Sequence, residues 1–209
     1  MDWARNIGEQ LAHPDGLFGS LVGSVMDAAN RKPSRLAVGI LNARDGERVL
    51  DAGCGTGATM AQMLRKGRCH VTGVDRSATM IRRARARMKA LGKTSLCELA
   101  VGEIGHLPFV SNSYDAALAL NVFYFCGDDG AMVTDLRRVL RPGGRLVAYV
   151  THRRSMAGWS FTSKGTHRLF DQRELTALLV QGGFDPTHIH VEVHEIAHKV
   201  AGLFALARA

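Results

Sequence analysis

A short apolar run that leads directly into a glycine-rich turn is the feature that most constrains the fold of this chain. Val49 and Leu50 precede an acid, Asp51, and a stretch in which glycine occupies every second position from Gly53 to Gly57. Glycine adopts the backbone angles of a tight turn and lets a ligand approach the main chain closely. Because a helix-forming segment follows, the pattern predicts a strand, turn and helix that hold a nucleotide.

The acid at the end of the next apolar run supports this interpretation. Asp75 closes the run 71–74 and lies eighteen residues beyond Gly57. A carboxylate at this place accepts hydrogen bonds from both hydroxyls of a ribose. A nicotinamide dinucleotide site is the alternative, but it calls for a third glycine where the sequence has Ala58.

Length and composition indicate an ordinary globular chain. It has 209 residues, 46% of them apolar, so we expect a single domain with a substantial core over 1–209. No run approaches the ~20 apolar residues of a membrane span. The first residues lack the basic start and apolar middle of a signal peptide, so a cytoplasmic location is expected. The four cysteines form no C-x-x-C pair, so we expect neither a metal site nor a disulfide framework.

Strand-like and helix-like segments alternate after residue 46, which predicts a doubly wound, Rossmann-like α/β fold with a mostly parallel sheet. The expected strands are 48–51, 70–75, 96–101, 114–121 and 145–150, and the expected helices are 58–66, 77–91, 128–140 and 172–181. Two further strand-like runs, 188–194 and 198–207, are expected to form an antiparallel hairpin and complete a seven-stranded sheet.

The domain therefore divides into three parts. A helical N-terminal cap covers 1–46, a cofactor-binding core 47–150, and a substrate loop with the C-terminal hairpin 151–209. Within the cap, an apolar stripe over 18–29 has helical spacing, and we expect a break at 32–34 before a second helix over 35–43. This cap is a candidate lid over the ligand site, although simple packing explains such a stripe equally well.

Several motifs, taken together and in order, resemble those of class I S-adenosylmethionine-dependent methyltransferases, in particular the group that includes the ubiquinone/menaquinone C-methyltransferases. The glycine turn with Asp51 resembles the first motif of this family. The other matching segments are Val74-Asp75-Arg76-Ser77-Ala78-Thr79-Met80, Gly102-Glu103-Ile104-Gly105-His106-Leu107-Pro108-Phe109, Tyr114-Asp115 through Asn121-Val122-Phe123-Tyr124-Phe125, and Arg138-Val139-Leu140-Arg141-Pro142-Gly143-Gly144.

The resemblance implies that S-adenosyl-L-methionine is the cofactor and S-adenosyl-L-homocysteine the product. It implies a role for each matching position, from the methionine end of the cofactor to the adenine. The methionine part would be held by Asp51, Gly53, Cys54, Gly55, Gly57 and Asn121; the ribose by Asp75; and the adenine by Arg76, Met80, Gly102, Glu103 and Ile104.

Two of these positions leave a question open. The family usually has aspartate where this chain has Glu103, so the carboxylate lies one methylene farther out. Cys54 is interpreted as a small residue that fills the turn, and the alternative is a reactive thiol, which would need a lowered pKa.

Candidates for acid–base chemistry are few. Tyr124 follows the fourth strand and His152 the fifth, and both are candidate catalytic residues at the side where an acceptor approaches. His167 is a second candidate base and directly follows a loop over 155–166 that is a candidate lid. The pair Arg153-Arg154 is a candidate holder of an anionic substrate.

The chain carries a net charge of +8, and its basic residues concentrate between Arg76 and Lys93, where no acid occurs. Apolar residues recur there at helical spacing, so the basic groups form the solvated face of an amphipathic helix, or a patch that binds phosphates. The family resemblance implies methyl transfer to a small-molecule acceptor. We expect no nucleic-acid partner and leave contact with a membrane surface open. The alternatives to small-molecule methylation are methylation of RNA or of a phospholipid headgroup, and cofactor binding without catalysis.

Overall fold

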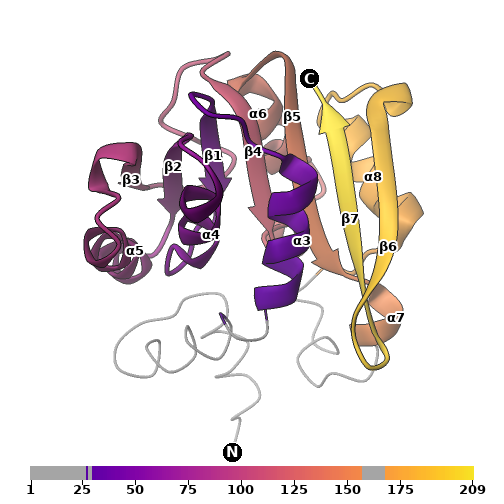
Figure 1. Ribbon diagram of the computed structural model, residues 1–209. Coiled ribbons are helices and arrows are strands. Elements are labelled where there is room, and N and C mark those ends of the chain that lie inside the picture. Colours follow the sequence, from indigo (N-terminus) through magenta and orange to yellow (C-terminus); the bar gives the residue numbers. More distant parts are fainter. Residues whose placement is uncertain (1–26, 28–29, 157–167) are drawn as a thin grey trace, which may run out of the picture.

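A seven-stranded sheet forms the centre of the computed structural model, which describes residues 27, 30–156 and 168–209 (Figure 1). The strands lie in the order β3-β2-β1-β4-β5-β7-β6. Their bounds are β1 Arg48–Ala52, β2 His70–Asp75, β3 Cys97–Val101, β4 Tyr114–Leu120, β5 Leu140–Thr151, β6 Ile189–Ala197 and β7 Val200–Arg208.

The sheet is parallel from β3 to β5, and β7 lies antiparallel between β5 and β6. The predicted doubly wound, mostly parallel sheet with an antiparallel C-terminal hairpin is therefore confirmed. The chain leaves β1 toward β2 on one side and returns to β4 on the other, so the order of strands reverses beside β1. Ligands of open α/β sheets bind at the carboxyl ends of the strands at such a switch point.

Helices cover both faces of the sheet (Figure 1). One face carries α3 (Arg31–Leu41), α4 (Ala58–Lys66) and α5 (Ala78–Ala90), and the other carries α6 (Ala131–Val139) and α8 (Gln172–Gln181). Each face buries its own apolar cluster, with Met60, Leu64 and Met88 in the first and Phe123, Leu136, Phe170 and Leu178 in the second. The short helix α7 spans Arg153–Met156, and single 3₁₀ turns are η1 Thr94–Leu96, η2 Phe123–Phe125 and η4 Pro186–His188.

Local sequence signals fix several helix ends. The Ser77 hydroxyl accepts a hydrogen bond from the Met80 backbone N–H and caps α5. At the start of α8, Asp171 and Glu174 form a reciprocal capping box, and Gly182 follows its last residue. These caps explain why α5 and α8 lie close to the segments expected from the sequence.

Other boundaries differ from the expectation. Helix α3 begins at Arg31, so the predicted break at 32–34 is wrong: Pro33 lies in the first turn, where its missing N–H costs no intrahelical bond. Strand β5 begins at Leu140 instead of residue 145, with a register shift opposite Tyr114 and Ala116. The predicted helix over 18–29 lies, apart from residue 27, outside the described residues, as do 157–167 of the predicted loop.

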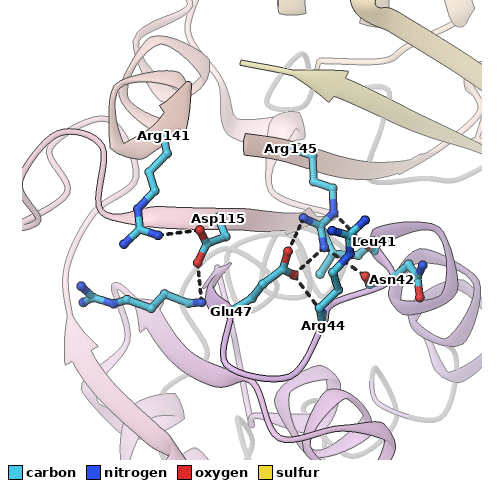
Figure 2. Close-up of polar contacts among 8 residues, drawn as sticks. Leu41, Asn42, Arg44, Glu47, Asp115, Arg141 and Arg145 are labelled. Atoms are coloured by element: carbon cyan, nitrogen blue, oxygen red, sulfur yellow. Dashed lines mark hydrogen bonds and ion pairs between the residues drawn. The ribbon is translucent and has the colours of Figure 1, made fainter. Parts of the chain in front are cut away.

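An arginine clamp holds the end of α3 to the sheet (Figure 2). Arg145 on β5 donates to the carbonyl oxygens of Leu41, at 2.6 Å, and Asn42, at 3.0 Å, and pairs with Glu47 at 2.7 Å. Burial alone would raise the pKa of Glu47, but the hydrogen bonds from Arg145 and from the Arg44 backbone, together with the charges of both arginines, outweigh burial and lower this pKa. The clamp satisfies carbonyls at the α3 C-terminus that have no partner within the helix.

We predict that Arg145→Met destabilises the fold by about 1–3 kcal/mol, because it removes the guanidinium that donates to Glu47 and to two helix-end carbonyls. The melting temperature should fall by about 2–4 °C for each kcal/mol. The control is Arg141→Met, because the Arg141 side chain is 45% exposed and its pair with Asp115 lies at the surface; that change should cost less than about 1 kcal/mol. Equal losses in urea unfolding of the two variants would contradict the clamp.

Candidate cofactor-binding site

A cavity of about 210 Å³ opens at the carboxyl ends of β1, β2 and β4. The glycine turn, the residues after β2 and the residues after β4 form its walls, which is where the topology places a ligand. All of the cofactor residues predicted from the sequence line it except Gly57: they are Asp51, Gly53, Cys54, Gly55, Asp75, Arg76, Met80, Gly102, Glu103, Ile104 and Asn121.

The glycine turn has the geometry that its residues require. Gly53, Gly55 and Gly57 have φ angles of 76°, 52° and 74°, in the left-handed region that favours glycine. A Cβ at Gly53 would lie 2.3 Å from a methyl carbon of Val122, so no larger residue fits there. Gly57 serves packing instead of the cavity, since a Cβ there would lie 3.0 Å from the Cβ of Ala84 on α5.

Asp51 is a buried carboxylate with spare hydrogen-bonding capacity. It is 2% exposed, and its Oδ2 has no hydrogen-bond partner among the described residues. Burial, and secondarily the nearby charge of Asp75, raises the pKa of Asp51 from 3.8 to about 7. Its place in the cavity wall suits a ligand that brings a donor, such as an ammonium group.

Asp75 connects the glycine turn to the end of β2. Its two carboxylate oxygens accept the backbone N–H groups of Gly55 and Ser77, both at 2.9 Å. Burial nevertheless raises the pKa of Asp75. Because each carboxylate oxygen has two lone pairs, both can still accept a hydrogen bond from the cavity, as a ribose diol requires.

The remaining walls suit a flat ring. The guanidinium of Arg76 lies over the ring of Phe125, at 5.5 Å from its centroid, and both residues line the cavity. Met80 is buried beside them, whereas Glu103 is exposed at the mouth. These residues, with the fit of Asp51 and Asp75 to an amine and a ribose, make the cavity compatible with an adenosyl cofactor.

A hydrogen-bonded chain leads from the cavity to the sheet. Asn121 follows β4 with φ 59°, and its side-chain amide donates to Asn30 at 2.9 Å. The hydroxyl of Tyr124 donates to the side-chain oxygen Oδ1 of Asn121 at 3.2 Å and accepts the backbone N–H of Thr151. Left-handed backbone at a non-glycine residue is uncommon and concentrates at functional sites, and asparagine tolerates it best.

The two candidate catalytic residues lie behind the cavity and not in its wall. Burial raises the pKa of Tyr124, so its phenol stays protonated near neutral pH. The pKa of His152 is lowered by burial and by Arg154, and its Nδ1 accepts the Arg154 N–H. Their assignment as catalytic residues stays a prediction.

The other candidates from the sequence also lie away from the cavity or outside the described part. Arg153 pairs with Glu174 at 2.8 Å, so its charge serves the start of α8. His167 belongs to the part of the chain that the structure does not describe.

Burial raises the pKa of the Cys54 thiol well above its usual value, which fits the turn-filling interpretation and not the reactive thiol.

Sequence reasoning missed several cavity residues near the N-terminus. Asp27, Asn30 and Ser34 line the cavity, together with Thr56 from the glycine turn and Met132 from α6. The three N-terminal positions precede the first family motif, and no local pattern marks them. Only their contacts with segments distant in the sequence reveal them.

Most of the residues that line the cavity fall in a segment that matches a known family. Residues 49–144 match the family model of the methyltransferase domain. Over this segment the chain is therefore similar to methyltransferase domains of the class I, S-adenosylmethionine-dependent type.

Curated proteins that match the chain are named methyltransferases, and solved structures share its fold. The chain is 30% identical to 24-methylenesterol C-methyltransferase 2 of Arabidopsis thaliana, over 62% of this chain and 36% of that protein. It is 32% identical to 27-O-demethylrifamycin SV methyltransferase of Amycolatopsis mediterranei, over 66% of this chain and 50% of that protein. A geranyl diphosphate methyltransferase in complex with SAM shares the fold with a TM-score of 0.68 and 18% identity, over 84% of each chain.

The chain thus spans about a third to a half of the length of these two curated relatives. Among the described residues, no helix is long and apolar enough to cross a membrane. The same part of the chain contains no group of three or more potential ligand side chains suited to a metal ion.

We predict that Asp51→Asn makes unfolding less dependent on pH. Because the folded pKa of about 7 lies above the usual 3.8, ionisation opposes folding; the penalty is absent below about pH 4, grows up to about pH 7 and is complete above it. The variant should therefore gain about 1 kcal/mol or more over the parent chain between pH 5 and pH 8.

Urea unfolding of the ligand-free protein at pH 5, 6, 7 and 8 measures this difference. Glu195→Gln, a change of an exposed carboxyl on β6, is the control and should follow the parent chain at every pH. Parallel curves for Asp51→Asn and the parent chain would contradict the raised pKa.

Proposed function

We propose that this chain transfers a methyl group from S-adenosyl-L-methionine to a small-molecule acceptor. The observation that carries this proposal is the pairing of two carboxylates at the ends of neighbouring strands. Asp51 has an oxygen without a partner among the described residues, and Asp75 has lone pairs to spare, and both line one cavity. An amine and a ribose diol at opposite ends of one ligand would satisfy both.

In this proposal the cofactor lies across the glycine turn. Asp51, with Cys54 and the open backbone at Gly55, holds the methionine end, and Asn121 contacts it from β4. Asp75 accepts the ribose hydroxyls. A Cβ at Gly55 would meet nothing within 4 Å, so the turn leaves this approach free.

The adenine would lie between Met80 and the Arg76–Phe125 pair. Glu103 would accept from its amino group, and the backbone N–H of Ile104 would meet a ring nitrogen. Glu103 is exposed and carries an extra methylene compared with the aspartate usual in the family, so its carboxylate can reach inward from the mouth.

The cofactor supplies an activated methyl group on a sulfonium. The residues of this chain supply position and a dry wall, since an in-line displacement depends on holding the acceptor against the methyl. Leu120, Val122 and Met132 add apolar surface to the cavity wall, and Val122 lies against Gly53 at the proposed methionine end. These side chains exclude water and favour an apolar acceptor surface.

The demand for a base depends on the acceptor. A neutral hydroxyl or amine must lose a proton, whereas an ionised phenol or an electron-rich carbon does not need a side-chain base at the transfer step. His152, neutral because its pKa is lowered, is able to accept a proton, and Tyr124 instead orients Asn121. One relative named above is a C-methyltransferase, and the other is named for a substrate that lacks an O-methyl group. The acceptor atom therefore stays open.

Calorimetric titration with S-adenosylmethionine, S-adenosylhomocysteine and NAD tests the proposal. We expect the first two to bind in the micromolar range and Asp75→Ala to weaken them at least tenfold, since each tenfold loss is about 1.4 kcal/mol of ribose contacts. Glu195→Ala removes an exposed carboxylate that does not line the cavity and should leave binding unchanged.

A positive result would be followed by a screen of acceptors with labelled methyl groups. Binding of NAD alone, or of none of the three ligands, would refute the proposal. Binding without transfer to any acceptor would favour the non-catalytic alternative.

A further inference from the structure

Three residues from distant parts of the chain form a closed polar cluster at the glycine turn. The hydroxyl of Thr56 donates to the carboxylate of Asp27, with distances of 2.8 and 2.7 Å to its two oxygens. Arg87 on α5 donates through Nη1 to the Thr56 hydroxyl at 2.7 Å and through Nη2 to Asp27 at 2.8 Å. A hydroxyl has one proton to donate and lone pairs to accept, so all contacts are satisfied at once.

The members of this cluster differ in their relation to the cavity. Asp27 and Thr56 line it, whereas Arg87 does not and reaches both from behind. Three residues after Asp27, Asn30 accepts a hydrogen bond from Asn121 at the end of β4. Asp27 is thereby tied to the glycine turn and to α5, and Asn30 is tied to the residue that follows β4.

The charges around the cavity indicate that Arg87 offsets the negative charge of Asp27. Among the described residues, the charged ones that line it are the acids Asp27, Asp51, Asp75 and Glu103 and one base, Arg76. Asp27 would therefore add negative charge to a cavity that already holds two buried carboxylates. Arg87 supplies the opposite charge directly at Asp27, and its planar fork fixes the directions of both hydrogen bonds.

We infer that Arg87 is a positioning residue that holds Asp27 and Thr56 as a latch over the cavity and thereby sets the affinity for the cofactor. This inference rests on the proposed function. The Arg87 side chain is 34% exposed and that of Asp27 26%, and ion pairs of this exposure contribute little to global stability. The latch should therefore change ligand affinity much more than it changes the unfolding transition.

Titration with S-adenosylhomocysteine compares the parent chain with Arg87→Gln, Arg87→Lys and Arg85→Gln. We expect Arg87→Gln to bind at least tenfold more weakly, because Asp27 and Thr56 lose their common donor. Arg87→Lys keeps the charge but not the fork and should recover part of the loss. Arg85 is exposed on the same helix, so Arg85→Gln removes the same charge without touching the cluster and should bind as the parent chain does.

A second readout needs no ligand. Amide hydrogen exchange of the ligand-free protein should show faster exchange in the first turn of α3, from Arg31 onward, in Arg87→Gln than in Arg85→Gln. In addition, Asp27→Asn should weaken binding little further once Arg87 has been replaced, because residues of one network are not additive.

The outcomes separate the latch from the proposed function. If the parent chain binds S-adenosylhomocysteine and Arg87→Gln binds it equally well, with unchanged exchange in α3, the latch is overturned and the proposed function stands. If the parent chain does not bind, the proposed function fails and the affinity role of Arg87 fails with it. A loss of binding in Arg87→Gln that is matched by Arg85→Gln would also overturn the latch, because it would reflect net charge alone.

Discussion

The attachment of the glycine turn to the end of β2 is the interaction on which the site depends. The backbone N–H groups of Gly53 and Cys54 both donate to the carbonyl oxygen of Val74, at 2.8 and 3.0 Å. Gly55 then donates to the carboxylate of Asp75. The ends of two adjacent strands are thus fixed relative to each other by main-chain groups, which holds the carboxylates of Asp51 and Asp75 in the wall of one cavity.

The same arrangement makes the ionised forms of Asp51 and Asp75 unfavourable. Burial raises the pKa values of both Asp51 and Asp75, which means that the empty fold pays a cost to keep these carboxylates charged. A ligand that brings positive charge and hydrogen-bond donors lowers that cost when it binds. Acidic walls therefore favour a cationic ligand over a neutral one. In the proposed reaction, the loss of the sulfonium charge would lower the attraction to the product.

Much of the sheet and of the cavity follows from local sequence, because strand, turn and following helix are consecutive there. Asp51, the glycine turn and Asp75 are placed by segments whose patterns are short and regular, and the alternation of elements gives the fold class. Boundaries that depend on tertiary contacts cannot be predicted from local sequence. Strand β5, for example, begins at Leu140 because this residue pairs with Tyr114. Asp27, Asn30 and Ser34 were missed for the same reason, since their partners lie between 25 and 91 residues away in the sequence.

Helix α3 links the Arg145 clamp to the Asn30–Asn121 contact, which lie at opposite ends of the parallel strands. Its C-terminal end is held by Arg145 at the start of the parallel strands (Figure 2), and Asn30, which precedes its first residue, meets Asn121 at the cavity. A helix is stiff over this length, so a clamp at one end restricts the position of the other. The place of Asn30 and Ser34 in the cavity wall therefore depends on an ion pair remote from the ligand, and any loosening of the Arg145 clamp should be felt first where α3 meets Asn121.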